Sequence, residues 1–578
     1  MTETEIEALR EKKAESAANL LDMDLYGYRH ILEDTDKRLL EYTETVRHNP
    51  DDHNMYELFA LERFFRMADG YSWKAGRVRK YFDFYEMLRF NGQNGRQSYK
   101  LTPIQCFQFA NIFGFAREDN TRLIRYVILF VPRKFSKTTS AASLAFYELL
   151  MGPANAQAFV GANSYTQAKL CFDEIRAIAQ DFDPDGSIFQ INREKIFYKT
   201  SIRDAYARCL TANAKTQDGL NASLVIMDEY AQARNTKTKN GADLKNVLTS
   251  SMGARKEPLT VVITTASEVI DGPFAHELDG VKKILRGEAP ENPTMFASLF
   301  MPDPWDREDD PHTWAKVQPH LGITVEPDWY ENEWANAQLS AEDMVTFRTK
   351  LLNVFAINEK KSWFSVDKAN SLMSDWDIDK VPHGLECVVS FDLSVHDDFS
   401  AVAYTFYEPK NYDMYSHVDY YFPEGALEGH PNKELYRLWH EKGYLKFCNG
   451  DVIDVRMIAE DIIRRSRNLR IIRIAYDSYK AQDLTNILAT FGRNVLQPYK
   501  QTYGAFNLPV ESFEYMAWLD PPKIKLSRNP ITSYCLYNCM IDEDRLKNKK
   551  PIKISQYRKI DGAIVILMGV GSLNEYER

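Results

Sequence analysis

Apolar positions recur with two different periods along this chain of 578 residues, and the change of period divides it into regions. Residues 1–95 are charged and space their apolar side chains as a helix does, which predicts a helical N-terminal region. Residues 96–370 alternate short apolar runs with amphipathic segments, a pattern typical of an α/β domain with a parallel sheet. Residues 380–578 repeat this alternation. We therefore predict a helical region followed by two α/β domains.

The apolar runs also locate individual strands. A helical pattern at 141–150 follows the first of four strand-like runs in the first domain, which are 123–131, 157–161, 224–228 and 259–265. Residues 270–375 are rich in Trp and Pro, and we interpret them as the end of this domain plus a connector. In the second domain, a closing helix at 562–569 is predicted after two buried strands at 388–392 and 471–477.

The segment 131–138, Val-Pro-Arg-Lys-Phe-Ser-Lys-Thr, has the length and the ending of a phosphate-binding loop. Val131 and Ser136 stand where the usual G-x-x-x-x-G-K-[ST] pattern has glycines. The predicted strand before the loop and helix after it are the context that the motif needs. Loop amides and a helix N-terminus attract phosphate, Lys137 would reach the β- and γ-phosphates, and Thr138 would offer its hydroxyl to Mg²⁺. A basic turn capped by threonine is the simpler alternative.

A second segment strengthens the nucleotide interpretation. Residues 224–229 read Leu-Val-Ile-Met-Asp-Glu, which describes a buried parallel strand that delivers two carboxylates at its C-terminal end. Asp228 would hold the Mg²⁺ shell, and Glu229 would orient or deprotonate the attacking water. Strands often end in acidic residues without function, but the two motifs in this order favour an ATPase.

Three aspartates in the second domain form another candidate constellation. Asp392 and Asp477 follow buried strands, and Asp561 opens the last helical segment. Two-metal phosphodiester hydrolysis needs clustered carboxylates, and hard oxygen ligands suit Mg²⁺ and Mn²⁺. An aspartate on a first strand, one on a central strand and one on a late helix resemble the arrangement in RNase H-like nucleases. Asp398 is a secondary candidate for a metal ligand. Taken singly, each aspartate is better explained as a cap or a strand end, since the helix dipole favours an acid at a helix N-terminus.

Composition limits the remaining possibilities. The net charge of −10 argues against a chain that coats nucleic acid by bulk charge, although a local basic groove is compatible with it. The seven cysteines are scattered and lack the spacing of a zinc site, so we expect free thiols in a reducing cytosol. The first residues are acidic, unlike a signal peptide, and no apolar run approaches the ~18 residues of a membrane span.

These motifs together resemble the large terminase subunit of tailed bacteriophages, over most of the chain. An ATPase with a glycine-poor loop precedes an RNase H-like nuclease in that family. The segments that carry the resemblance, in family order, are Leu101–Gln105, Pro132–Thr138, Thr216–Leu220, Asp228–Glu229, Thr264–Ser267, Asp392–Ser394 with Asp398, Ala475–Asp477 and Lys559–Ala563. Ser136 departs from the family, which often has glycine there, and narrows the backbone freedom of the loop.

The resemblance implies roles for individual residues. Gln105 would contact adenine, and Thr264–Ser267 would sense the γ-phosphate. Arg133 would contact the γ-phosphate or the transition state, although Arg255 or another arginine, in cis or in trans, could be the arginine finger. The implied nucleotide-binding residues are Gln105, Arg133, Ser136, Lys137, Thr138, Thr139 and Asp228. The implied metal ligands are Thr138 and Asp228 for Mg²⁺ with ATP, and Asp392, Asp477 and Asp561 in the nuclease. Lys553 and Lys559 either contact DNA or are solvated surface lysines.

The resemblance also implies an activity and partners. It predicts ATP-driven translocation of viral double-stranded DNA into a procapsid and metal-dependent cutting of concatemeric DNA, with Mg²⁺ or Mn²⁺ in the nuclease site. The partners would be double-stranded DNA, the portal protein, the small terminase subunit and further copies of the chain in a ring, without a membrane. The protein would work in the host cytoplasm at the procapsid portal and be absent from the mature virion.

Two other classes of function stay open on the sequence alone. A helicase or remodeller whose C-terminal domain binds nucleic acid without cutting it would share the ATPase motifs, and the aspartate trio is the feature that distinguishes it. A structural assembly protein with decayed sites would explain the missing glycines. Retention of Lys137, Asp228, Glu229 and all three C-terminal aspartates argues against it.

Overall fold

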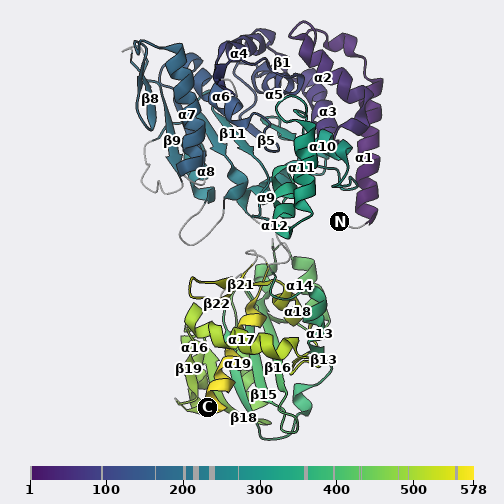
Figure 1. The fold of residues 1–578 in the computed structure, drawn as a ribbon, viewed down its shortest axis with the longest axis vertical. Helices are drawn as coiled ribbons and strands as arrows, with labels where there is room; N and C mark the ends of the chain where they lie inside the picture. The colour runs from purple at the N-terminus through teal and green to yellow at the C-terminus, as the bar shows by residue number, and fades with distance from the viewer. Residues whose placement is uncertain are drawn as a thin grey trace. The chain divides into compact units, whose positions relative to one another are not determined.

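The chain forms two compact units, Met1–Ile357 and Asn358–Arg578, which are described separately (Figure 1). The structure is a computed structural model and describes residues 3–92, 95–162, 165–199, 203–211, 220–233, 241–270, 272–356, 362–394, 398–428, 430, 432–478, 481–492, 494–553 and 558–577.

The predicted helical N-terminal region is confirmed, and it belongs to the first unit. Its principal helices are α1 (Glu3–Asp22), α2 (Lys37–His48), α3 (Met55–Gly70) and α4 (Ala75–Met87), followed by α5 (Pro103–Gly114). Phe64 of α3 packs against Phe107 of α5 in a core that continues to the strands of the sheet. A buried ion pair between Lys13 and Asp303, 2.8 Å long, ties α1 to the segment after β12. These helices are thus part of the first domain's core.

The sheet of the first unit has the strand order β12-β5-β11-β10-β6-β9-β8-β7, in which the first six strands are parallel and β8 and β7 are antiparallel. The bounds are β5 (Tyr126–Phe130), β6 (Gln157–Ala162), β7 (Phe189–Ile191), β8 (Lys195–Tyr198), β9 (Tyr206–Thr211), β10 (Leu224–Asp228), β11 (Leu259–Thr264) and β12 (Met295–Leu299). Strand β5 is shorter than the predicted 123–131 because the Leu123 amide bonds to Phe115 instead of joining the ladder.

Alternate residues of these strands face two different cores, which explains their uninterrupted apolar sequences. Val127 and Ile226 point into the core shared with the N-terminal helices, whereas Ile128 and Val225 point into a second core. The first core includes residues of α6 (Lys137–Met151) and α7 (Tyr165–Phe182), and the second includes residues of α8 (Gly241–Ser250) and α9 (Pro273–Leu285). Helices on both faces place the strand ends, and therefore the loops, at the edges of the sheet.

The Trp-rich stretch forms three helices at the end of the first unit. They are α10 (Pro311–Val317), α11 (Pro327–Ala337) and α12 (Ala341–Lys350). Trp314, Tyr330 and Phe347 build a small core of their own, with ring centroids 6.0–6.4 Å apart. The expected connector is therefore a packed helical segment.

The second unit holds a sheet of order β13-β20-β16-β15-β14-β18-β19, with β17 paired to β16. Strand β14 is antiparallel to β15 and parallel to β18. The strands are β13 (Met373–Ser374), β14 (Leu385–Asp392), β15 (Ser400–Tyr407), β16 (Met414–Pro423), β17 (Lys446–Cys448), β18 (Leu469–Tyr476), β19 (Leu496–Pro498) and β20 (Ile524–Ser527).

Helices cover both faces of this sheet as well (Figure 1). The last helix, α19 (Asp561–Glu577), packs on β14 and β15 within the core that also holds α17 (Tyr503–Trp518) and α18 (Pro530–Tyr537). Helices α15 (Val455–Ser466) and α16 (Gln482–Leu488) contribute to the opposite core. The remaining elements include α13 (Val366–Ser371), α14 (Lys433–Glu441) and a hairpin of β21 (Cys539–Glu543) and β22 (Lys549–Lys553).

The predicted end of the first domain at residue 370 needs correction. Phe364 lies in the core of the second unit, with its ring 5.7 Å from that of Phe513, and the boundary between units falls after Ile357. The apolar stretch around Phe364 is too short to show a periodicity, so the sequence does not indicate which of the two cores it joins.

A buried charge network ties β16 to α15 in the second unit. The carboxylate of Asp419 accepts hydrogen bonds from the Arg465 guanidinium at 3.2 and 3.3 Å, and both side chains are buried. Burial alone would raise the pKa of Asp419, but a hydrogen bond from His417 and the charges of His417, Lys446 and Arg465 lower it far below its usual range. The carboxylate therefore stays charged in the folded protein.

Asp419→Ala is expected to destabilise the second unit by about 3–5 kcal/mol, because it leaves the buried Arg465 charge without its main partner. The double variant Asp419→Ala/Arg465→Met should lose less than the single variant. Chemical denaturation of the three proteins checks this, and equal losses in the single and double variants would contradict it. Because the folded pKa is lowered, the stabilisation is present at neutral pH and is lost as the pH falls below about 4.

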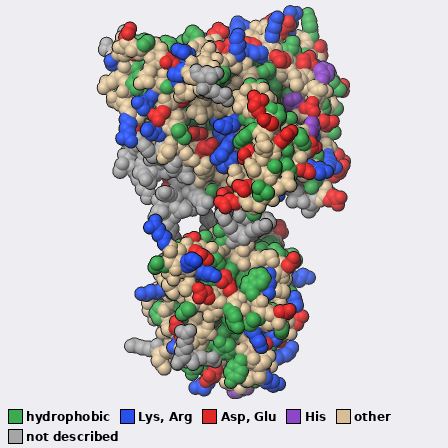
Figure 2. All heavy atoms as spheres, in the orientation of Figure 1, with side chains coloured by type: hydrophobic (Ala, Val, Ile, Leu, Met, Phe, Trp, Pro, Cys, Tyr) green, Lys and Arg blue, Asp and Glu red, His purple; other side chains and the backbone are tan. Residues whose placement is uncertain are grey.

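Acidic and basic side chains are interspersed on the visible face of each unit (Figure 2). None of the helices in the described parts of the chain combines the length and the apolar character needed to cross a bilayer.

Candidate active sites

The loop between β5 and α6 adopts the backbone of a phosphate-binding loop without glycine. Ser136 has φ 64° and ψ 33°, and Lys134 has φ 68°, which are left-handed conformations that glycine adopts most easily. The side chain of Phe135 between them is buried and stacks on His320 at 4.4 Å. Packing thus holds a conformation that the sequence alone would disfavour.

Ser136→Gly is expected to stabilise the first unit by about 1 kcal/mol while ATP hydrolysis is retained, because glycine removes the strain of the left-handed backbone. Ser140→Gly, one helical turn further in α6, is the matched control and should destabilise the unit, since that residue is helical. Thermal unfolding of both variants gives the test. Equal destabilisation by the two substitutions would refute the claim that the backbone at Ser136 is strained.

Lys137 lies at the first position of α6, between the two loops that follow β10 and β11. Its ammonium group is 3.1 Å from Glu229 Oε1 and contacts the hydroxyl of Thr265. Thr265 in turn donates a hydrogen bond to the carbonyl of Val131. The structure therefore brings Lys137 and Glu229 together at one edge of the sheet, as predicted from their strand-end positions.

The two acids after β10 differ in environment. Burial raises the pKa of Asp228 to about 7, with a further contribution from the charge of Glu229, while Lys137 lowers it. Glu229 has φ 51°, an unfavourable backbone for a non-glycine residue, and its amide donates to the carbonyl of Ile263. Strained residues of this kind cluster at functional sites. A divalent cation would relieve the unfavourable charge of Asp228.

The segment Thr264–Ser267 connects the loop after β10 to the loop after β5. Thr264 Oγ1 accepts a hydrogen bond from the amide of Ala231 at 2.9 Å, and Ser267 Oγ donates to the carbonyl of Ala231 at 2.7 Å. With the Thr265 contact to Lys137, this geometry is suited to transmitting a change at the phosphate site. We call residues 264–267 the sensor loop.

A pocket of about 950 Å³ opens beside the phosphate loop. Gln105, Ser136 and Thr139 line it, as expected of nucleotide-binding residues. Gln105 also has a structural role, because its amide oxygen accepts hydrogen bonds from the Thr102 amide and hydroxyl and caps α5. Other wall residues escaped the sequence analysis: Tyr85, Tyr99, His320, Ile323 and Trp329. They come from segments far apart in the chain, and no motif marks them.

The arginines proposed as fingers lie in different places. Arg133 is exposed, and its amide donates to the carbonyl of Lys350 while its own carbonyl accepts from Gln318. Arg255 precedes β11, so it lies at the opposite end of the strand from the sensor loop. Within the unit, Arg255 therefore cannot serve the same phosphate site as Lys137.

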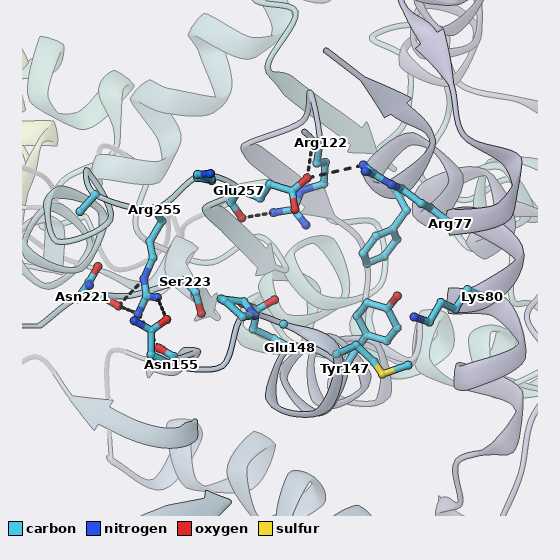
Figure 3. Close-up of a pocket in the computed structure, with 16 residues that line it drawn as sticks. Arg77, Lys80, Arg122, Tyr147, Glu148, Asn155, Asn221, Ser223, Arg255 and Glu257 are labelled. Atoms are coloured by element: carbon cyan, nitrogen blue, oxygen red, sulfur yellow. Dashed lines mark hydrogen bonds and ion pairs between the residues drawn. The ribbon is translucent and has the colours of Figure 1, made fainter. Parts of the chain in front are cut away.

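Arg255 instead lines a second pocket of about 690 Å³ at that opposite edge (Figure 3). It bonds to Asn155 and to the carbonyl of Asn221, and Arg122 bonds to backbone carbonyls at Glu257 and Pro258. The two guanidinium groups are thus used to hold loops at the start of β10 and β11.

In the second unit, three strand and helix ends bring the predicted aspartates into one electrostatic environment. Asp392 ends β14, Asp477 follows the neighbouring β18, and Asp561 begins α19. A side chain at Gly562 would clash with the hydroxyl of Tyr420, so glycine lets the start of α19 approach β16. The raised pKa of Asp392, about 8, is caused by burial and then by the charges of Asp561 and Asp477.

The buried carboxylate of Asp561 is only partly satisfied by hydrogen bonds. Its Oδ2 atom is buried without a hydrogen-bond partner among the described residues. Burial raises its pKa to about 6, against the opposing charges of Lys553 and Lys559. In the described parts of the chain, no three acidic, histidine or cysteine side chains already form a closed metal-binding group. Buried carboxylates that repel each other nevertheless fit a divalent cation.

Two lysines pair with the carboxylate of Asp398, the secondary candidate. Lys553 Nζ lies 2.6 Å from its Oδ2 atom and Lys559 Nζ lies 2.7 Å from its Oδ1 atom. Lys559 is buried, so the alternative of a solvated surface lysine is wrong for that residue. The segment Thr216–Gly219, which contributes to the family resemblance, lies outside the described residues.

Binding of Mn²⁺ is expected to tighten as the pH rises from about 6 to about 8, because Asp561 and Asp392 must lose protons whose pKa values are raised to about 6 and about 8. For the metal-free protein, the same raised pKa values mean stability that declines over this range. Calorimetric titration with Mn²⁺ across this range measures the effect, and Asp392→Asn should flatten the pH dependence. A pH-independent affinity would contradict the prediction.

The chain matches the family model for the terminase large subunit ATPase domain over residues 103–283 and that for the terminase large subunit endonuclease domain over residues 293–577. Protein YmfN of Escherichia coli (strain K12) is 26% identical over 441 residues, which cover 71% of this chain and 92% of the relative.

Phage proteins give the same picture. The large terminase subunit of Enterobacteria phage HK97 is 22% identical over 484 residues, covering 82% of this chain and 91% of that protein. The crystal structure of the HK97 large terminase superposes with a TM-score of 0.52 at 20% identity, covering 86% of this chain and 99% of that one, and supports the fold. The chain therefore belongs to the terminase large subunit family and carries its ATPase and endonuclease domains.

Proposed function

We propose that this chain is the motor and nuclease that moves viral double-stranded DNA into a procapsid with ATP and cuts the concatemer. The observation that carries the proposal is the presence of two separate sites in one chain. Lys137, Asp228 and Glu229 converge at an edge of the first sheet, and Asp392 and Asp561 interact in the second unit.

In the first site, different residues bind the phosphates, hold the metal ion and activate the water. The amides of the 131–138 loop and Lys137 bind the phosphates, Thr138 and Asp228 hold Mg²⁺, and Glu229 orients or deprotonates the water. Gln105 and the pocket beside it receive the base, and Arg133 approaches the γ-phosphate from its exposed position in the loop. Lys137 leaves Glu229 when a phosphate competes for its charge, which makes the glutamate available as a base.

In the second site, Asp392, Asp477 and Asp561 are the proposed ligands of Mg²⁺ or Mn²⁺. A pair of such cations stabilises the attacking and leaving oxygens of phosphodiester hydrolysis. The protein contributes buried carboxylates whose mutual repulsion favours cation binding, and Lys553 and Lys559 keep Asp398 in place beside them. A DNA contact of Lys553 would compete with its bond to Asp398.

The partners follow from the family and from the motor activity. We propose a ring of identical chains at the procapsid portal in the host cytoplasm, contacting the portal protein, the small terminase subunit and DNA. An arginine finger supplied in trans would complete the ATP site of the neighbouring chain.

The decisive experiment mixes the purified protein with portal-bearing procapsids, linear double-stranded DNA and ATP, and measures DNA protected from added nuclease. Protection that requires ATP supports packaging. Strand separation of a tailed duplex without protection or cleavage would favour a helicase or remodeller. Omission of procapsids is the control, because protection must then disappear.

A further inference from the structure

One turn at the end of α12 binds both backbone polar groups of the sensor residue Ala266. The amide of Ala266 donates to Asn353 Oδ1 at 2.8 Å, and its carbonyl accepts from Lys350 Nζ at 2.9 Å. Ala266 and Asn353 are fully buried, so water does not compete for these bonds. Side chains three residues apart therefore fix the position of a loop more than eighty residues earlier in the sequence.

The same turn also holds the phosphate loop and the edge of the sheet. The carbonyl of Lys350 accepts a hydrogen bond from the amide of Arg133 at 2.9 Å. Asn353 Nδ2 donates to the carbonyl of Phe300, just after β12, at 2.7 Å. Thr265, the neighbour of Ala266, contacts Lys137. The segments that follow β5, β11 and β12 are thus all hydrogen-bonded to Lys350 or Asn353.

The residue type at position 353 fits this role. Asn353 has φ 55°, and asparagine is among the few residues besides glycine that tolerate this backbone. Its side chain uses a donor and an acceptor together, which aspartate, serine and glycine cannot reproduce at the same reach. An unfavourable backbone held by two buried bonds indicates a position under functional constraint.

We propose that Lys350 and Asn353 form a positioning latch that holds Ala266 and carries its nucleotide-dependent movement to α12. This inference rests on the proposed ATP site, since Ala266 can respond to nucleotide only if Lys137 and Thr265 do. In this proposal the latch acts through the sensor loop and the backbone of the phosphate loop, and not by binding phosphate. Helix α12 then becomes the element that moves when the phosphates change.

The test compares full-length wild type with Lys350→Met, Lys350→Arg and Asn353→Gly. The matched control is Arg348→Met on the same helix, because Arg348 bonds to Glu308 and leaves the sensor loop untouched. For each protein, kcat and KM of ATP hydrolysis are measured. Hydrogen exchange of the α12 peptide is then compared between ADP and a non-hydrolysable ATP analogue.

We expect Lys350→Met to lower kcat by about 10-fold with little change in KM, and to abolish the difference in α12 exchange between the two nucleotides. Lys350→Arg should restore both, since arginine can also donate to the Ala266 carbonyl. Asn353→Gly, which keeps the backbone conformation but removes both bonds, should resemble Lys350→Met. If either variant unfolds, the other gives the answer through the same exchange measurement.

Two results would overturn the latch. An unchanged kcat with the exchange difference intact would mean that the turn only supports the fold. A raised KM at constant kcat would mean that Lys350 binds phosphate directly. Lys137→Ala is run alongside as the variant that should lose ATP hydrolysis. If wild type itself has no ATPase activity, the proposed ATP site is refuted. If wild type is active and the Lys350 and Asn353 variants behave like it, only the latch is refuted.

Discussion

Replacing Lys137 with alanine is expected to reduce ATP hydrolysis by at least about 100-fold, because it removes the positive charge that the phosphate loop places against the transferred phosphoryl group. The replacement also frees Glu229 from its 3.1 Å ion pair, so loss of activity cannot be attributed to a missing base. Folding should change little, since Lys137 is at the start of α6 and is not in the core.

The measurement is phosphate release at saturating ATP, with Lys283→Ala as the control. Lys283 is a half-exposed lysine of α9 that pairs with Asp279 on the surface, so its loss should leave the rate unchanged. Undiminished hydrolysis in Lys137→Ala would refute the assignment of the loop. Metal-dependent DNA cleavage by the same variant in the absence of ATP should persist if the two sites are chemically separate.

Asp392→Asn is expected to lower metal-dependent DNA cleavage by about 100-fold or more, because a neutral amide replaces a carboxylate ligand of the proposed cation pair. The same substitution should stabilise the metal-free protein at pH 8 and above by roughly 1–3 kcal/mol, since a buried charge beside Asp477 and Asp561 is removed. A gain in stability with a loss of activity is the signature of a functional carboxylate.

Plasmid relaxation and linearisation with Mn²⁺, together with thermal unfolding, measure both effects. Asp483→Asn is the matched control, because Asp483 is an exposed aspartate in the first turn of α16. Cleavage that survives Asp392→Asn would remove the nuclease assignment and favour a domain that binds DNA without cutting it. A destabilised Asp392→Asn protein would instead identify Asp392 as a structural residue.

The sequence locates the elements that carry the candidate site residues better than it locates their surroundings. The strand over 224–228 is found as expected, because a fully apolar run ending in acids has few alternatives in an α/β domain. Asp392, Asp477 and Asp561, the proposed nuclease residues, likewise lie at strand and helix ends, as the pattern predicts. In each case a local pattern fixes both the element and the side chain at its end.

What the sequence does not predict is side-chain partnership between distant segments. Tyr85 and His320 meet at one pocket from regions that no motif connects, and Lys559 is buried against Asp398 although lysines are usually exposed. Asn353 belongs to the same class, because its function depends on a left-handed backbone and two distant partners. Periodicity carries no information about such contacts.

The glycine-free phosphate loop has a mechanical consequence. A loop with glycines at its bends is hinged and can yield when a load is applied. Here the ring of Phe135 packs against those of His320 and Phe300, and Lys134 and Ser136 occupy the flanking left-handed positions. Such a loop deforms little. A displacement at the nucleotide would therefore reach the neighbouring helices instead of being lost in a change of loop conformation. In the proposed packaging motor, a stiff phosphate loop would limit the work lost between ATP hydrolysis and movement of the DNA.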